Sequence, residues 1–215
     1  MDIHAARREL RTERLWLHNG HEGLAEALCD FHLRNRAHLQ AWDPPTPADF
    51  YTVARQAERI QMAIANFNDG SGLRYWLSPL NDANQVIGSV HINQVSRGAF
   101  HNAMLGYSLD AKLQGQGLMH EALSAAIAEA FSPRFNLHRL QAAYQPTNVR
   151  SAAVLARLGF EQEGLARDYL FINGAWRDHC IGALRNPGFF RPGSWLWARH
   201  SRVGGNPGFR SWNSW

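Results

Sequence analysis

The chain has 215 residues, of which 45% are hydrophobic and 11% aromatic, a composition that suits one globular domain with a sizeable buried core. It contains no run of about 18 uncharged apolar residues and no apolar segment of signal-peptide length near its start, so we expect a soluble, cytoplasmic protein without a membrane partner. The net charge of +4 arises beyond Arg185, where four arginines and no acids occur, which leaves 18 bases and 18 acids in residues 1–185. Because binding to a phosphate backbone requires clustered bases, this balance argues against a nucleic-acid site on the folded part.

The first third of the chain predicts a strand followed by two helices. Residues 12–18 alternate roughly as a strand does, and residues 22–39 carry apolar side chains at helical spacing. The adjacent prolines after Asp43 must end that helix, because they remove backbone donors. A second helix is expected to begin near Thr46 or Ala48, with Thr46 as a plausible cap. Its predicted buried stripe consists of Val53, Ala57, Ile60, Ile64 and Phe67.

The rest of the chain predicts three strands and then alternating helices and strands. The three strands form an antiparallel meander, because turn residues separate them. The dipeptide Asn173-Gly174 favours the positive φ angles of a two-residue hairpin turn. The expected elements are strands at 73–77, 86–95 and 103–109, a helix at 121–131, a strand at 139–144, a helix at 149–158, and strands at 160–172 and 175–184.

This order of elements predicts an α+β fold. We expect a mixed, mostly antiparallel central sheet of about seven strands, covered by helices, with a parallel crossover around the 118–131 helix. The domain is predicted to span residues 1–185. Residues 186–215 have no helical or strand period and hold four of the eight tryptophans, so they are predicted to be an irregular, poorly ordered extension.

A glycine-containing loop, Gln114-Gly115-Gln116-Gly117-Leu118-Met119, stands between a predicted strand and a predicted helix. Its glycines let several backbone N–H groups converge, and the helix adds its own unpaired N–H groups and the positive end of its dipole. Such a cup binds a pyrophosphate. The absence of a following Lys-Ser/Thr pair disfavours a P-loop, and the preceding meander disfavours a dinucleotide-binding βαβ unit.

The neighbours of this loop make the signal more specific. The spacing Gln114-x-x-Gly117-x-Met119, after Leu105-Gly106-Tyr107-Ser108-Leu109 and before Asn148-x-x-Ser151 and Leu158-Gly159-Phe160, resembles the acetyl-CoA signature of the GNAT superfamily of N-acetyltransferases. Further runs are similar to the ribosomal-protein-alanine N-acetyltransferases, the RimJ type, over roughly residues 8–185. These runs are 38–44, 105–108, 115–119, 155–160 and 173–179.

The resemblance implies the GNAT fold, with helices on both faces of the sheet, and acetyl-CoA as cosubstrate without a metal. The strand at 104–109 should splay from its neighbour, so that its backbone pairs with the pantetheine arm. Met119 replaces the Gly or Ala usual in the superfamily, so its side chain must point away from the phosphates. The implied cofactor-binding residues are Tyr107, Ser108, Leu109, Gln114, Gly115, Gln116, Gly117, Leu118, Met119, Asn148 and Ser151.

Two of these residues have more than one predicted role. The resemblance implies that Ser151 also acts catalytically, by protonating the leaving thiolate, although a residue in the first turn of a helix can equally serve only the backbone. Asn148 fits both a cofactor contact and an N-cap of the helix that follows. The aromatic side chains Trp42, Trp76 and Trp176 are predicted to be core, although Trp42 lies in the interhelical loop that shapes the acceptor slot in related folds.

The general base is left open. Related enzymes carry glutamates where this chain has Leu170 and Met104. An α-amino group has a reference pKa of about 7.7 to 8.0, against about 10.4 for lysine. An N-terminal amine is therefore partly neutral at physiological pH, and a weaker base suffices to deprotonate it than a lysine side chain requires. Candidates for carrying the proton are Asp168, Glu163, Tyr144, His91 and His120.

The resemblance implies acetyl transfer to the N-terminal alanine of a small-subunit ribosomal protein. Two alternatives stay open at this point. One is acetylation of a small amine, such as an amino acid, a polyamine or an antibiotic. The other is a ribosome-assembly factor that binds pre-ribosomal particles and whose catalysis is dispensable.

Overall fold

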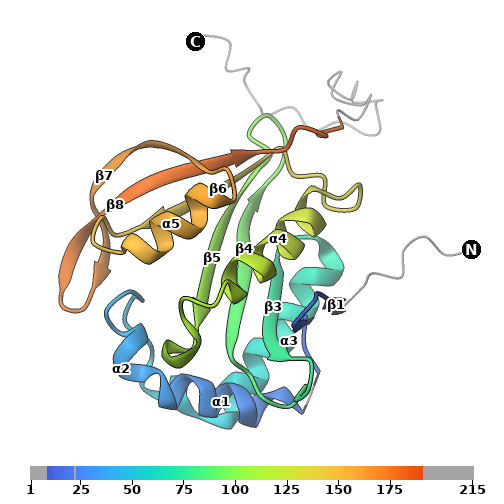
Figure 1. Cartoon of the computed structure of the whole chain (residues 1–215), viewed down its shortest axis with the longest axis vertical. Helices are drawn as coiled ribbons and strands as arrows, with labels where there is room; N and C mark the ends of the chain where they lie inside the picture. The colour runs from blue at the N-terminus through green and yellow to red at the C-terminus, as the bar shows by residue number, and fades with distance from the viewer. Residues whose placement is uncertain (1–8, 22, 191–215) are drawn as a thin grey trace, which may run out of the picture.

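The computed structural model describes residues 9–21 and 23–190, which form one eight-stranded sheet in the order β1-β2-β3-β4-β5-β6-β8-β7 (Figure 1). All neighbouring strands are antiparallel except β5 and β6, which are parallel. The predicted α+β class and the parallel crossover are confirmed. The elements are β1 (Glu9–Arg11), β2 (Leu15–His18), α1 (Leu24–Arg34), α2 (Arg36–Leu39), the 3-10 turn η1 (Ala48–Tyr51), α3 (Val53–Asp69), β3 (Leu73–Pro79), β4 (Gly88–Ser96), β5 (Asn102–Leu109), the 3-10 turn η2 (Ala111–Leu113), α4 (Leu118–Phe131), β6 (Arg139–Tyr144), α5 (Val149–Arg157), β7 (Glu161–Ile172) and β8 (Ala175–Arg185).

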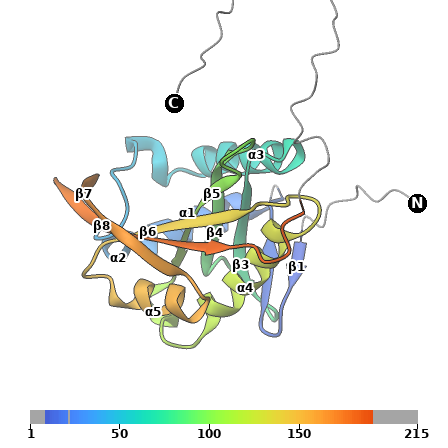
Figure 2. The same ribbon diagram turned by 90° about the horizontal axis from the view of Figure 1, so that it is seen from above.

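Helices cover both faces of this sheet (Figure 2). Helix α3 lies on one face, and α4 and α5 lie on the other. The larger core cluster joins the sheet to α4, whose small residues Ala122, Ala126 and Ala130 are fully buried and let the helix approach the strands closely. A second cluster joins α1 and α3 around Trp76, which is 1% exposed, as predicted for a core residue.

The strand predicted at residues 12–18 is β2, which begins only at Leu15, and an unpredicted strand, β1, precedes it. Residues 9–11 and 15–18 pair antiparallel, with Leu10 opposite Leu17, and the turn between them is closed by a hydrogen bond of 2.9 Å from the Thr12 amide to the Leu15 carbonyl. The sheet therefore has eight strands where about seven were predicted. The alternating pattern did not reveal the turn at Thr12.

The helices before the meander also differ from the prediction. The predicted 22–39 helix breaks at Asn35, whose φ of −104° and ψ of 7° are not helical. Helix α3 begins at Val53 and is capped by Thr52, whose side chain accepts from the Arg55 amide, so the prediction of Thr46 as the cap was wrong. Val53 is 44% exposed because it lies in the first turn, whereas Ile60 and Phe67 of the predicted stripe are buried.

The β7–β8 hairpin turns at Asn173 and Gly174, whose φ angles of 49° and 78° confirm the predicted two-residue turn. Trp176 near this turn is 61% exposed, so its prediction as a core residue was wrong. The hairpin lies at the edge of the sheet, with β7 as the outermost strand.

Strands β5 and β6 separate part-way along their length. Their parallel pairing runs only from Asn102 opposite Arg139 to Leu105 opposite Ala142. Beyond Leu105, β5 still pairs with β4 as far as Leu109, but no longer with β6 (Figure 1). The predicted splay is therefore present, and it leaves the β6-facing backbone groups of the second half of β5 without a strand partner.

The chain continues to pack on the domain after β8. Asn186 is 8% exposed; its amide donates to the His138 carbonyl at 2.8 Å, and its side chain donates to the Leu137 carbonyl at 2.9 Å. Phe190 exchanges two hydrogen bonds with the side chain of Asn136. The first five residues of the predicted extension thus belong to the packed domain, and residues 191–215 lie outside the described part of the chain.

Candidate active site

The loop between β5 and α4 forms a cup of backbone N–H groups. Gly115 and Gly117 have φ angles of 78° and 80°, which L side chains rarely adopt, so the turn depends on glycine. Gly117 is the N-cap of α4, and no side chain caps the helix, so its first amides stay available to a ligand. The side chain of Gln114 is held by His38 at 2.9 Å. An anion is the ligand that this arrangement favours.

Asp110 fixes the chain just before the cup. Its carboxylate accepts from Arg34 at 2.8 Å and from Asn35 at 3.2 Å, and it caps the η2 turn through the Lys112 amide at 3.1 Å. Burial would raise the pKa of Asp110, but these hydrogen bonds lower it below its ordinary value. The break between α1 and α2 thus places Asn35 where its side chain reaches Asp110 at the start of the loop.

One acid lies in the first turn of α4, where it competes with an anionic ligand. Glu121 accepts hydrogen bonds from the Thr12 hydroxyl at 2.6 Å, from the Arg14 amide at 2.8 Å and from the Arg14 guanidinium at 2.7 Å. Burial would raise the pKa of Glu121, but these contacts lower it. Arg14 also donates to the Gln116 carbonyl at 2.9 Å. The carboxylate is therefore neutralised by the β1–β2 turn, and the cup stays favourable for anions.

A hydroxyl pair lies beside the separated strands. The Tyr107 hydroxyl on β5 lies 2.6 Å from the Ser151 hydroxyl on α5, and 3.3 Å from the Ser151 carbonyl. Asn148 caps α5 by accepting from the Ser151 amide at 3.1 Å, as predicted. Burial raises the pKa of Tyr107 to about 12, so the phenol keeps its proton at every physiological pH. Sequence analysis considered only the backbone of Tyr107 and missed its hydroxyl, because the partner is 44 residues away.

A cavity of about 400 Å³ opens between the separated strands, α5 and the loop. Eight of the predicted site residues line it: Tyr107, Ser108, Leu109, Gln114, Gly115, Met119, Asn148 and Ser151. Gly117 lines an adjacent surface hollow with Arg14 instead, and Leu118 is buried in the core. Gln116 is exposed. Met119 is only 6% exposed and packs in the core, so its bulk does not fill the cup.

Two of the five base candidates line this cavity, namely His91 and Tyr144. Glu163 is paired with Arg139, and Asp168 lies where the register of the β7–β8 hairpin shifts. His120 lines the adjacent hollow. The structure therefore does not bring these last three side chains to the cavity.

His91 is a poor proton acceptor in its surroundings. Its ring lies against Gly106, where an added Cβ would come within 2.3 Å of Nε2. Burial, together with the charges of Arg74 and Arg59, lowers the pKa of His91 to about 3. The ring is neutral at pH 7, but it holds an added proton weakly.

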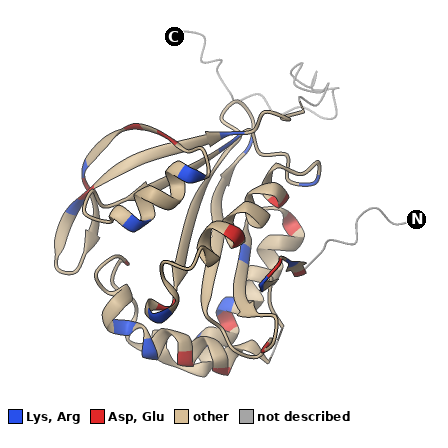
Figure 3. Cartoon of the chain, viewed as in Figure 1, with Lys and Arg blue, Asp and Glu red and all other residues tan. Residues whose placement is uncertain are grey.

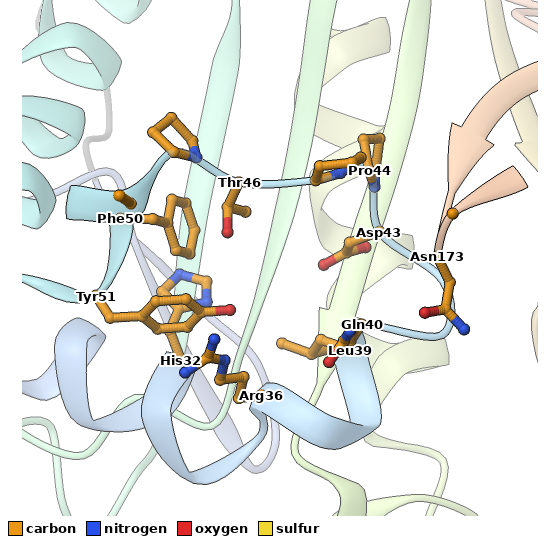
Figure 4. Close-up of a pocket in the computed structure, with 14 residues that line it drawn as sticks. His32, Arg36, Leu39, Gln40, Asp43, Pro44, Thr46, Phe50, Tyr51 and Asn173 are labelled. Carbon is orange, nitrogen blue, oxygen red and sulfur yellow. The ribbon is translucent and has the colours of Figure 1, made fainter.

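A second cavity, of about 460 Å³, lies between the α2–η1 loop, α1, η1 and the β7–β8 turn (Figure 4). Figure 4 shows Asp43, Thr46, Phe50 and Tyr51 around this space, with Asn173 at its edge. Leu39 and Asp43 line both cavities, and the half-buried Trp42 lines the first. Asp43 lies in the 38–44 run but was not a predicted site residue, because its position between two cavities is visible only in the structure.

Two arginines of α5 line the first cavity. They are Arg150 and Arg157, and helix α5 carries only basic charged side chains (Figure 3). Such a lining favours an anionic ligand. Within residues 9–21 and 23–190, no three His, Cys, Asp or Glu side chains are grouped so as to hold a metal ion. In the same residues, no helix combines the length and apolar character needed to cross a membrane.

The family described as acetyltransferase (GNAT) domain matches residues 14–161. The chain belongs to the GNAT acetyltransferases. The match covers the β5–α4 loop, the separated strands and the hydroxyl pair. The predicted family, fold and acyltransferase class are therefore confirmed.

Named relatives support a finer placement of this acetyltransferase. It is 40% identical to the [ribosomal protein uS5]-alanine N-acetyltransferase of Escherichia coli K12, over 83% of this chain and 91% of that protein. The crystal structure of ribosomal-protein-S5-alanine acetyltransferase from Vibrio fischeri superposes with a TM-score of 0.81 at 33% identity, over 85% of this chain and 99% of that one. Mycobacterium smegmatis RimJ, in complex with CoA-disulfide, superposes with a TM-score of 0.75 at 28% identity, over 82% and 86%.

Proposed function

We propose that this acetyltransferase moves the acetyl group of acetyl-CoA to the α-amine of an N-terminal alanine on a small-subunit ribosomal protein, with uS5 as the first candidate. The observation that carries this proposal is the 40% identity to the E. coli uS5-alanine enzyme over 91% of its length. The site is compatible with it, because the first cavity is lined by part of the anion cup and shares Leu39 and Asp43 with the second cavity.

In this proposal, the pyrophosphate of acetyl-CoA lies on the amides of Gln114 to Met119. The pantetheine arm lies in the gap between β5 and β6, where the backbone from Tyr107 to Leu109 has lost its β6 partner. The thioester then lies near the hydroxyls of Tyr107 and Ser151, which line the same cavity. The acceptor enters from the second cavity.

The reaction requires a neutral amine and a stabilised leaving group. The amine nitrogen attacks the acetyl carbonyl carbon, so that a C–N bond forms and the C–S bond breaks. The hydroxyl pair donates a hydrogen bond to the sulfur as negative charge develops there. Tyr107 suits this role, because its raised pKa of about 12 keeps it protonated.

A panel of amines tests the proposal. Acetyl-CoA is offered with peptides that begin with Ala, Ser or Met and contain an internal lysine, and products are located by mass spectrometry. We expect acetylation of the Ala peptide at its α-amine and none at the lysine. A matched peptide with a blocked N-terminus should stay unmodified. Turnover of an amino acid or polyamine, without turnover of any peptide, would replace the proposal by the small-amine alternative.

A further inference from the structure

The two cavities of the acetyltransferase meet at a single carboxylate. Asp43 and Leu39 are the two residues that line both. Asp43 is also the sole Asp or Glu among the described residues that line either cavity. An acceptor that passes from the second cavity toward the thioester must therefore pass this side chain.

The backbone of Asp43 is held in place, and its carboxylate is free to bind a ligand. The Asp43 amide donates to the Leu39 carbonyl at 2.9 Å, and two prolines follow the residue. The loop is tied to the first cavity by a hydrogen bond of 3.1 Å from Gln145 to the Ala41 carbonyl. In the part of the chain that the structure describes, the carboxylate itself has no hydrogen-bond or ion-pair partner, and Figure 4 shows it directed into the cavity.

The surroundings of Asp43 are otherwise basic or neutral. His32 and Arg36 face the second cavity, and His91 and His179 face the first. The tyrosine hydroxyls of both cavities and His38 complete the titratable lining, together with the two arginines of α5. The charge of Arg59 on α3 also reaches Asp43. A cationic α-ammonium group finds its one oppositely charged partner in this carboxylate.

We propose that Asp43 binds the α-ammonium group of the acceptor and accepts one of its protons, so that it serves as the base of the reaction. This inference rests on the proposed function, and it names a residue outside the positions where related enzymes carry their glutamates. Asp43 is exposed to solvent as a residue, which leaves a route for its proton. Desolvation by the protein atoms around the carboxylate raises its pKa to about 6, and Arg59 opposes this shift, so this pKa lies closer to that of the amine than an ordinary aspartate's does.

One proton moves from the ammonium nitrogen to an Asp43 oxygen, and the freed lone pair forms the C–N bond. The C–S bond then breaks, and its electron pair leaves on sulfur. A second proton leaves the new amide nitrogen and reaches the sulfur by way of the Tyr107 and Ser151 hydroxyls, so that CoA departs as a thiol. Asp43 releases its proton to solvent through the open second cavity.

The test compares Asp43→Asn with wild type on an Ala-starting peptide at pH 6.5 and pH 9.0, with saturating acetyl-CoA. Without a base, the enzyme uses only amine that is already neutral, which is about 3% of the total at the lower pH and about 90% at the higher pH for an amine pKa near 8. We expect kcat/KM to fall about 100-fold at pH 6.5 and by tenfold or less at pH 9.0. Asp43→Glu should restore most of the activity at pH 6.5.

Asp49→Asn is the matched control, because Asp49 lies on the nearby η1 turn but lines neither cavity. It should stay within about twofold of wild type at both pH values. A loss of equal size at both pH values for Asp43→Asn would overturn the proposal. If that variant does not fold, the wild-type profile decides: kcat/KM should stay high well below the pKa of the amine, and a fall in step with the neutral fraction of the amine below about pH 8 would overturn the proposal. Wild-type turnover of the Ala peptide tests the proposed function separately.

Discussion

Removal of the Ser151 hydroxyl probes how the thiolate is stabilised. In Ser151→Ala, the Tyr107 hydroxyl loses its partner at 2.6 Å and keeps the Ser151 carbonyl at 3.3 Å, to which it then donates its only proton. A hydrogen bond to a charged group contributes about 1.5 to 3 kcal/mol, so we expect kcat to fall by about 10- to 150-fold. The backbone amide of residue 151 still donates to the Asn148 side chain that caps α5, so the melting temperature should change little.

The relative acidities show why the hydroxyl pair acts through a hydrogen bond rather than by early proton transfer. The pKa of Tyr107 is about 12, whereas a thiol has a reference value of about 8.5, so full transfer from the phenol to the thiolate is uphill by about 5 kcal/mol. The pair therefore stabilises the developing charge and passes a proton only as the sulfur departs. Because the two hydroxyls act as one unit, Tyr107→Phe and the double variant should each lose about as much as Ser151→Ala.

The assay is release of free CoA at saturating peptide, together with calorimetric titration of CoA. We expect the CoA dissociation constant to stay within about threefold, because neither hydroxyl belongs to the amide cup. Ser71→Ala, in the exposed turn after α3, is the control and should behave as wild type. A kcat for Ser151→Ala within twofold of wild type would refute the reasoning, and so would losses that multiply in the double variant.

Three further predictions concern the cup, the splayed strand and the end of the domain. Gly117→Ala, at a φ of 80°, should raise the KM for acetyl-CoA about tenfold, measured by steady-state kinetics, because an L residue is strained there. Gly106→Ala places a methyl group 2.3 Å from His91 Nε2 and should lower the free energy of unfolding by about 3 kcal/mol in denaturant titrations, with no such loss in a His91→Ala background. Truncation after Arg185 should lower the free energy of unfolding by about 2 kcal/mol, because it removes Asn186 and its buried hydrogen bonds. Truncation after Phe190 should leave the melting temperature unchanged. Equal effects of the two truncations would contradict this placement of the domain boundary.

The features that the sequence determined by itself are local ones. Gly115 and Gly117 indicated the anion cup, because glycine adopts φ angles near 80° without the steric cost that an L side chain meets there. Asn173-Gly174 indicated its hairpin turn and Asn148 its helix cap for the same reason, since each interaction closes within a few residues. The helices and strands of the second half followed from periodicity and turn residues in the same way.

Tertiary structure alone decided the features that depend on distant partners. The hydroxyl pair joins Tyr107 to a residue 44 positions away, and Asp43 acquires its place only where two cavities meet. Three of the five base candidates lie outside the first cavity, because residue type says nothing about which way a side chain faces. The physical reason is that cavities and their pKa shifts arise from the packing of whole elements, whereas turns and caps arise from the backbone of neighbouring residues.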